Sequence, residues 1–279
     1  MTQHPLNAQE RLALVRLKVR RAEKHLTELR AAIDAFLATQ PYRVVNKGGS
    51  YEIDRVAPVP DCIGAIIGDV VQNLRSALDH LQRQLMLVAL EVETSERESH
   101  FPIGKKARNY ETMLQGMKDK GELREDAFKV LLAVQAYKKG KGHSLWVLNR
   151  LNAIDKHRII LTAGGSFRAV NLGAFISRMP GASYISSDGI RREIGTGRPI
   201  PDNPTIRDFF IGPANIMCPL KVGDKLFSGA AEMDLINDFR FDVSLNEPQV
   251  TESRPVFKTL KEFADAVGCI IDDLCPCLN

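Results

Sequence analysis

The chain has 279 residues and a mass of 31.0 kDa, and 44% of its residues are hydrophobic, 26% charged and 6% aromatic. A chain of this length and composition buries a core without metals or disulfides, which excludes a disordered protein, a collagen-like repeat and a small cross-linked scaffold. The formal net charge is only +4. Residues 1–160 hold 26 basic and 19 acidic residues, whereas residues 161–279 hold 12 basic and 15 acidic ones. The positive charge therefore belongs to the N-terminal half.

Nothing in the chain has the pattern of a membrane span or a secretion signal. No apolar run approaches the roughly 20 residues that cross a bilayer, and residues 1–30 are polar and strongly charged. We therefore expect a cytoplasmic protein without membrane contact, and neither a metal nor a cofactor is predicted. The cysteines lack the paired spacing of a zinc site and are expected to be reduced, with a redox or soft-metal pair at the C-terminus as the alternative. They are Cys62, Cys218, Cys269, Cys275 and Cys277.

The first elements expected are a long helix and a hairpin. Apolar residues recur at three- and four-residue steps over residues 8–39, which predicts a helix that ends before Pro41. Residues 42–46 and 50–56 alternate in the manner of strands on either side of Gly48-Gly49. A β-hairpin is therefore expected, with the glycines supplying positive φ angles.

The clearest predicted element follows two prolines. Asp61 is suited to cap the N-terminus of a helix, and apolar residues then recur at alternating steps of four and three over about eight turns. This spacing places them on one side of the helix, which is typical of a bundle or a coiled coil. The seam consists of Ile67, Val71, Leu74, Leu78, Leu81, Leu85 and Val88.

Three more helices are expected at residues 110–117, 125–137 and 144–156, joined by connections rich in lysine and glycine. Residues 1–157 are therefore interpreted as a helical bundle with a hairpin inserted at residues 42–56.

Beyond residue 157, short strand-like runs are separated by turn residues, and a last helix is expected over residues 259–274. The segment 195–204 is expected to be a surface loop because it holds three prolines. The predicted fold class is α+β: an N-terminal helical bundle with an inserted hairpin, then a small antiparallel sheet within a β-rich region, residues 158–279, and a C-terminal helix. The expected strands are 158–161, 167–172, 183–185 and 239–245.

Polar side chains on the helix that begins at Asp61 form the first candidate site. Arg75 flanks the apolar seam, and His80 lies about 140° from Arg75 around the helix. One interpretation is a solvated face on which Arg75 and Asp79 form an i,i+4 ion pair, and the other is a second interface or a binding site. The stripe opposite the seam consists of Asp69, Asn73, Ser76, His80 and Arg83.

The segment Asn73-Leu-Arg75-Ser-Ala-Leu-Asp79-His80 contains the pattern Arg-x4-His on a long bundle helix. In this respect the chain resembles HEPN-domain proteins, helical bundles that often pair so that two such motifs face each other. Many of these proteins are metal-independent endoribonucleases of toxin–antitoxin and defence systems, and others are non-catalytic binding modules. The resemblance covers at most residues 1–157, and the position after the arginine, commonly asparagine in the family, is Ser76.

The resemblance implies catalytic roles for Arg75, Asp79 and His80. Cleaving RNA without a metal requires a group that handles the 2′-OH proton, which suits His80, and a cation on the phosphate, which suits Arg75. Because side chains about 140° apart on one helix do not converge on one point, two symmetry-related helices would share the site. We therefore expect a homodimer through the bundle, with RNA or another anionic ligand.

A second polar cluster lies near residue 157. Asp155 and His157, with Asn73 from the earlier helix, are candidates to support the site, and Asp155 would orient Arg75 or His80 if it reaches them. The alternative is ordinary helix capping, since basic side chains oppose the negative end of a helix. The cluster consists of Asn149, Asn152, Asp155, Lys156, His157 and Arg158.

The third signal is charge. Ten lysines or arginines and five acidic residues lie between Gly104 and Gly142, and three of the lysines are candidates to bind phosphate. A solvated lysine-rich surface is the alternative, because few aromatic residues interleave for base stacking. The candidate phosphate-binding residues are Lys138, Lys139 and Lys141.

Three hypotheses follow for the function. The first is a HEPN-like endoribonuclease, and the second is a non-catalytic HEPN-like module that binds nucleic acid, nucleotide or a protein partner. The third is a structural or interaction protein in which the polar residues of the long helix only direct packing.

Overall fold

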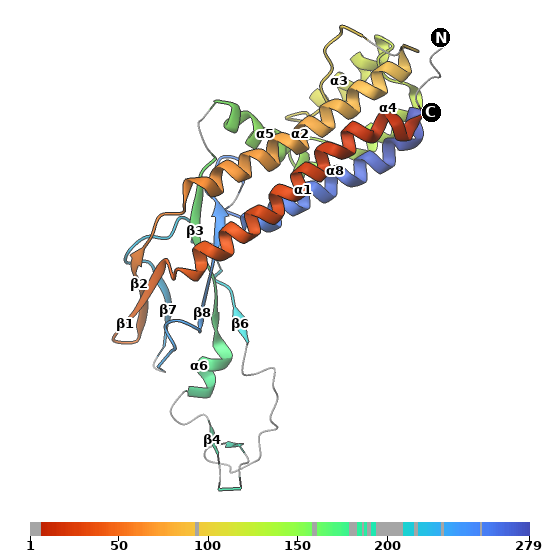
Figure 1. The fold of residues 1–279 in the computed structure, drawn as a ribbon. Helices are drawn as coiled ribbons and strands as arrows, with labels where there is room; N and C mark the ends of the chain where they lie inside the picture. Colours follow the sequence, from red (N-terminus) through yellow and green to blue (C-terminus); the bar gives the residue numbers. More distant parts are fainter. Residues whose placement is uncertain are drawn as a thin grey trace.

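The α+β fold class is confirmed in a computed structural model, in which long helices stand at one end and small antiparallel sheets at the other (Figure 1). The structure describes residues 7–92, 95–157, 161–178, 183–185, 187–188, 191–193, 209–214, 217–229, 232–251 and 253–279. The helices are α1 (Ala8–Ala38), α2 (Asp61–Ala89), α3 (Ala107–Asp119), α4 (Glu125–Val134), α5 (His143–His157), α6 (Leu172–Arg178), α8 (Val256–Leu274) and the 3-10 helix η1 (Cys275–Leu278).

The long helices begin in two different ways. Asn7 and Glu10 form a reciprocal capping box at the start of α1, which satisfies backbone N–H groups that have no partner within the helix. The prediction that Asp61 caps α2 is wrong, because the N-cap residue is Pro60 and no side chain caps the backbone there. Asp61 is the first helical residue instead, where its carboxylate still opposes the positive end of the helix dipole.

The shorter helices of the first half differ from prediction at their ends. α4 ends at Val134 rather than at residue 137, because Gln135 adopts a left-handed conformation with φ 53°. The chain then pairs in parallel with an earlier segment through a bridge between Gly104 and Tyr137. α3 and α5 are both longer than expected.

Three groups of strands were found. The predicted hairpin is confirmed, with φ angles of 63° at Gly48 and 89° at Gly49 in its turn. A strand from the second half extends the hairpin into a three-stranded sheet, β1-β2-β7, and a second sheet has the order β6-β3-β8. The strands are β1 (Tyr42–Lys47), β2 (Ser50–Val56), β3 (Ala163–Asn171), β4 (Ser183–Ile185), β5 (Arg191–Glu193), β6 (Phe210–Ile211), β7 (Lys225–Ser228) and β8 (Phe239–Leu245).

Two predicted strands differ from the structure. The strand expected at residues 167–172 starts earlier, at Ala163, and the chain enters α6 at Leu172 instead of remaining extended. Of the strand expected at residues 158–161, only Leu161 is described, and it lies outside any strand. The surface loop expected at residues 195–204 lies outside the described residues.

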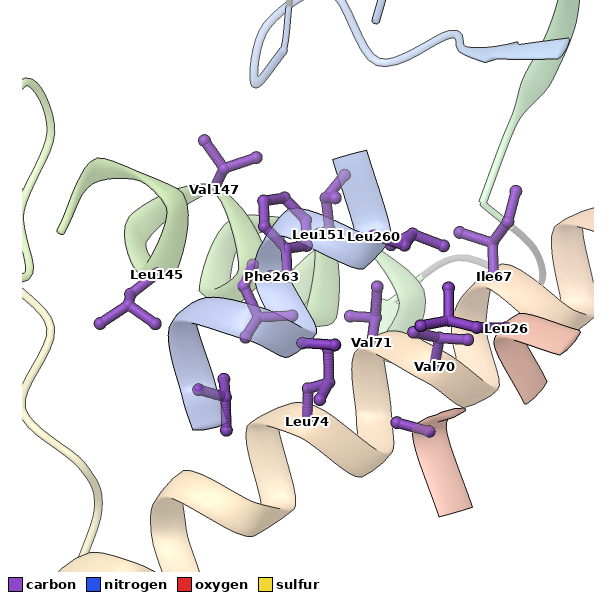
Figure 2. Packing of buried hydrophobic residues seen from close by; sticks show 14 of the residues in the cluster. Leu26, Ile67, Val70, Val71, Leu74, Leu145, Val147, Leu151, Leu260 and Phe263 are labelled. Atoms are coloured by element: carbon purple, nitrogen blue, oxygen red, sulfur yellow. The ribbon is translucent and has the colours of Figure 1, made fainter. Parts of the chain in front are cut away.

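The core lies where α1, α2, α5 and α8 meet, and Figure 2 shows apolar side chains from all four helices converging there. The predicted seam of α2 is buried up to Leu85, and full burial of each large apolar side chain contributes about 1.5–3 kcal/mol. α8 begins at Val256, three residues before the predicted start, and packs against the helices of the first half. Among the described helices, none is both long enough and apolar enough to span a membrane.

Candidate functional site

Arg75 of α2 is held inside the protein by three partners. Its side chain is buried, with only 8% of the residue exposed. Nε donates to Asn149 Oδ1 at 3.0 Å, and Nη2 donates to the carbonyl oxygen of Phe101 at 3.4 Å. Nη1 lies 2.7 Å from Asp79 Oδ1 and forms an ion pair with it, although the contact lacks hydrogen-bond geometry. α5 and the segment before α3 therefore both contact α2 through this one guanidinium.

Asp79 is the second centre of the same network. Its Oδ1 accepts the backbone N–H of Phe101 at 2.9 Å, and His100 Nδ1 lies 3.7 Å from the same oxygen. Burial lowers the pKa of Arg75, and the neighbouring Asp79 carboxylate opposes that shift. The expected i,i+4 ion pair is present, but it ties a chain segment to α2 instead of standing on a solvated face.

His80 lies apart from this network. It is half-buried, and it makes no hydrogen bond or ion pair with any residue that the structure describes. His100 is the histidine that approaches Asp79. The sequence carries no signal for His100, because it follows a turn and has no helical spacing to Arg75.

The residues expected to support the site do not gather around Arg75. Asn73 Nδ2 donates to the Asp69 carbonyl oxygen of its own helix at 2.8 Å, and His157 is exposed at the end of α5. Asp155 forms no hydrogen bond or ion pair with another residue that the structure describes. It therefore orients neither Arg75 nor His80, which are both described. From the same polar cluster it is Asn149 that reaches Arg75.

Asp155 packs closely against α2. A Cβ at Gly68 would lie 2.6 Å from Asp155 Oδ1, so a larger residue there would require the Asp155 carboxylate to move. Burial, and secondarily repulsion from Asp69, raises the pKa of Asp155 above its ordinary value near 3.8.

The raised pKa predicts that Asp155 destabilises the folded state at neutral pH. The folded state binds this proton more tightly than the unfolded state, so the free energy of unfolding falls as pH rises from about 3.8 through the folded-state pKa. Asp155→Asn is expected to raise the free energy of unfolding by about 0.5 kcal/mol at pH 7 and not at pH 3. Urea unfolding at both pH values measures this, and a variant that is less stable at pH 7 would contradict it.

Two runs of lysine meet at the start of α3 and α5. The Gly104 N–H donates to the carbonyl oxygen of Ala136 at 2.9 Å, and Gly104 and Tyr137 form a parallel bridge. Because the bridge is parallel, the two chain segments run in the same direction there, and the lysines that follow Gly104 and Tyr137 come after the same end of the bridge. We call the five exposed lysines there the lysine patch, and none of them forms an ion pair with a described residue. It consists of Lys105, Lys106, Lys138, Lys139 and Lys141.

Aromatic side chains pack against one lysine of the patch. Lys138 Nζ lies 5.1 Å from the centre of the Trp146 ring, a cation–π geometry, and the His143 ring stacks on Trp146 at 5.6 Å. Burial, with the positive charges of Lys138 and Arg254, lowers the pKa of His143. This histidine therefore adds little positive charge to the patch at neutral pH.

The described residues offer no metal site, and a large cavity lies apart from the predicted site residues. Among the described residues, no group of three or more histidine, cysteine, aspartate or glutamate side chains is placed to hold a metal ion. A cavity of about 990 Å³ lies beside the hairpin and β8, and none of the predicted site residues lines it. Comparison with protein-family models, with curated proteins and with solved structures finds no match to the chain.

Proposed function

We propose that the helical half of this chain is a HEPN-like module that binds RNA through the lysine patch. The observation that carries the proposal is the bridge between Gly104 and Tyr137, which brings together two lysine runs separated by more than 30 residues of sequence. Ammonium groups without acidic partners bind phosphate as point charges, and they release counterions from the polymer when they do so.

The surroundings of the lysine patch favour contacts with the RNA backbone over contacts with its bases. Trp146 is only 7% exposed, so its ring supports Lys138 and is not free to stack on a base. Contacts with phosphate give affinity without sequence preference. Binding at the patch alone should therefore depend strongly on salt and weakly on sequence.

RNA binding is tested with a charge-reversed protein. The triple variant Lys138→Glu, Lys139→Glu, Lys141→Glu is expected to bind labelled single-stranded RNA about 100-fold more weakly than wild type in 0.1 M salt. Three lost phosphate contacts should also reduce the slope of log affinity against log salt by about 2 to 3. Fluorescence anisotropy at several salt concentrations measures both quantities.

A matched control has the same change in net charge elsewhere. Three exposed lysines lie outside the lysine patch: Lys221 before β7, Lys225 in β7 and Lys258 in α8. Changing these three to glutamate should weaken RNA binding far less than the patch variant does. Equal losses in the two triple variants, or no salt-dependent binding by wild type, would remove the basis of the proposal and favour a structural or interaction protein.

Metal-independent RNA cleavage is the second candidate, and the unpartnered His80 favours it. A half-buried imidazole without a bond to described residues is available to handle a proton. Arg75 would have to exchange one of its partners for phosphate, or a second copy of the chain would have to supply the cation, which again suggests a homodimer. Incubation of labelled RNA with wild type and with His80→Ala in EDTA tests this, and an inert wild-type dimer at high concentration excludes it.

A further inference from the structure

Gln82 of α2 is a fully buried side chain whose polar atoms have no partner. Its exposed fraction is 0%, and neither its amide nitrogen nor its amide oxygen forms a hydrogen bond with a described residue. A primary amide offers two donors and an acceptor, and leaving them unmet in the interior is costly. Partners from outside the chain, an ordered water or a ligand, would satisfy these atoms.

Gln82 borders a cavity of about 390 Å³ between α2, α3 and the segment before α3, a volume that fits a small molecule. The Ser99 hydroxyl on its wall is also buried and unpartnered. The rest of the wall is mixed: the thioether side chains of Met86, Met113 and Met117 form its apolar part, and it also includes polar and charged residues, among them His100 and Thr112.

The walls of this cavity are held in place by the same network that surrounds Arg75. Asp79 accepts the N–H of Phe101 at 2.9 Å, and Arg83 donates to the Ser95 carbonyl oxygen at 2.6 Å. The segment between Ser95 and Phe101 is thereby fixed against α2. Hydrogen bonds to α2 therefore fix the wall of the cavity that this segment forms.

The chemistry of the walls selects a flat heterocycle. A carboxamide presents a donor and an acceptor side by side, which matches the N6 amino group and N7 of adenine, and thioethers pack well against aromatic rings. Glu98, Lys120 and Glu122 also line the cavity, so its wall carries more negative than positive charge and does not favour a phosphate group. We propose that this cavity binds an adenine base and that the Gln82 amide, which is covered in the empty cavity, turns to recognise its N6–N7 edge.

The inference deepens the proposed function and rests on it only where RNA is the source of the base. A free adenine nucleoside has the same edge, and the experiment below separates the two sources. Gln82 lies seven residues after Arg75 and thus on the same side of α2, so a bound base would lie two turns from that guanidinium.

Adenosine binding measured by calorimetry is the direct test. Wild type is expected to bind adenosine at least 10-fold more tightly than uridine, and Gln82→Leu should weaken adenosine binding about 10-fold or more, because a bidentate contact is lost. Gln72→Leu, at an exposed position of the same helix, is the control and should leave binding unchanged. Equal affinity for adenosine and uridine, or unchanged binding by Gln82→Leu, overturns the proposal.

Variants at Gly116 test the cavity without disturbing Gln82. Gly116 lines the cavity, and a Cβ built there meets no atom within 4 Å. Gly116→Leu should therefore fold and fill the space, weakening adenosine binding 10-fold or more, whereas Gly116→Ala should bind within about twofold of wild type. Full binding by Gly116→Leu, with an unchanged melting temperature, would place the ligand elsewhere and overturn the proposal.

Two further measurements separate this proposal from RNA binding by the lysine patch. The patch variant should bind adenosine as wild type does, so failure of the proposed function leaves the cavity intact. Gln82→Leu should keep salt-dependent RNA binding and lose any preference for oligoadenylate over oligouridylate. A preference of wild type for oligoadenylate assigns RNA as the source of the base, and adenosine binding without it assigns the free nucleoside.

Discussion

Arg75→Ala is expected to lower the free energy of unfolding by about 3 kcal/mol. The substitution leaves Asp79 with an uncompensated charge, and it removes the donor that Asn149 and the Phe101 carbonyl group use. Removing one member of a buried ion pair costs more than the pair contributes when it is intact, because the remaining charge has lost its partner. Urea unfolding at pH 7 measures the loss.

A second arginine of this chain provides a matched control. Arg30 and Asp34 form an i,i+4 pair on α1 at 3.3 Å, and both side chains are more than half exposed. The Arg30 guanidinium also lies 5.0 Å from the centre of the Phe257 ring, a cation–π contact that is weak at an exposed site. Arg30→Ala should therefore lower the free energy of unfolding by about 1 kcal/mol or less. Equal effects at the two arginines would mean that the burial of Arg75 adds nothing, and would restore the interpretation of a solvated face.

This difference affects how any activity experiment is designed. A loss of RNA cleavage in Arg75→Ala could not be separated from a loss of folded protein. Arg75→Lys keeps a positive charge but cannot keep three planar contacts, so it is a milder change. His80→Ala removes a half-buried side chain that forms no hydrogen bond or ion pair with a described residue, and it is therefore the cleaner test of catalysis.

Local patterns predicted those parts of the fold that local interactions determine. The seam of α2 follows from 3.6-residue periodicity, and the hairpin follows from alternation around two glycines in a tight turn. The sequence does not predict β5, β6 and β7, because they are two to four residues long and exist through pairing with other strands. Tertiary pairing of this kind leaves almost no mark on local sequence.

The candidate site also has a part that the local sequence predicts and a part that it does not. The contact between Arg75 and Asp79 was predictable because helix geometry places residues i and i+4 together. Asn149, Phe101 and His100 come from other elements, and their positions depend on how α5 and the segment before α3 pack on α2. The burial of Gln82 could not be predicted either. The sequence pattern of a glutamine beside an apolar seam is the same whether α3 or water covers the side chain.

Gly165→Val is expected to lower the free energy of unfolding by about 3 kcal/mol, although β propensity alone predicts a gain in the middle of a strand. A Cβ at Gly165 would lie 2.5 Å from Tyr42 Cζ. That ring packs edge-on against Phe36 of α1 at 6.1 Å and against Phe241 of β8 at 4.9 Å. The ring cannot move without opening the junction between the hairpin, α1 and the second sheet.

A double-mutant cycle with Tyr42→Leu separates this clash from a general intolerance of β3 to larger residues. With the ring removed, Gly165→Val should cost at least 2 kcal/mol less than in wild type, because both effects arise from one contact. Gly268→Ala is the control of opposite sign: it lies in α8, a Cβ there meets no atom within 4 Å, and a gain of about 0.5–1 kcal/mol is expected. Additive losses in the cycle would show that Tyr42 is not the reason why residue 165 must be glycine. The backbone of β3 itself would then require the glycine.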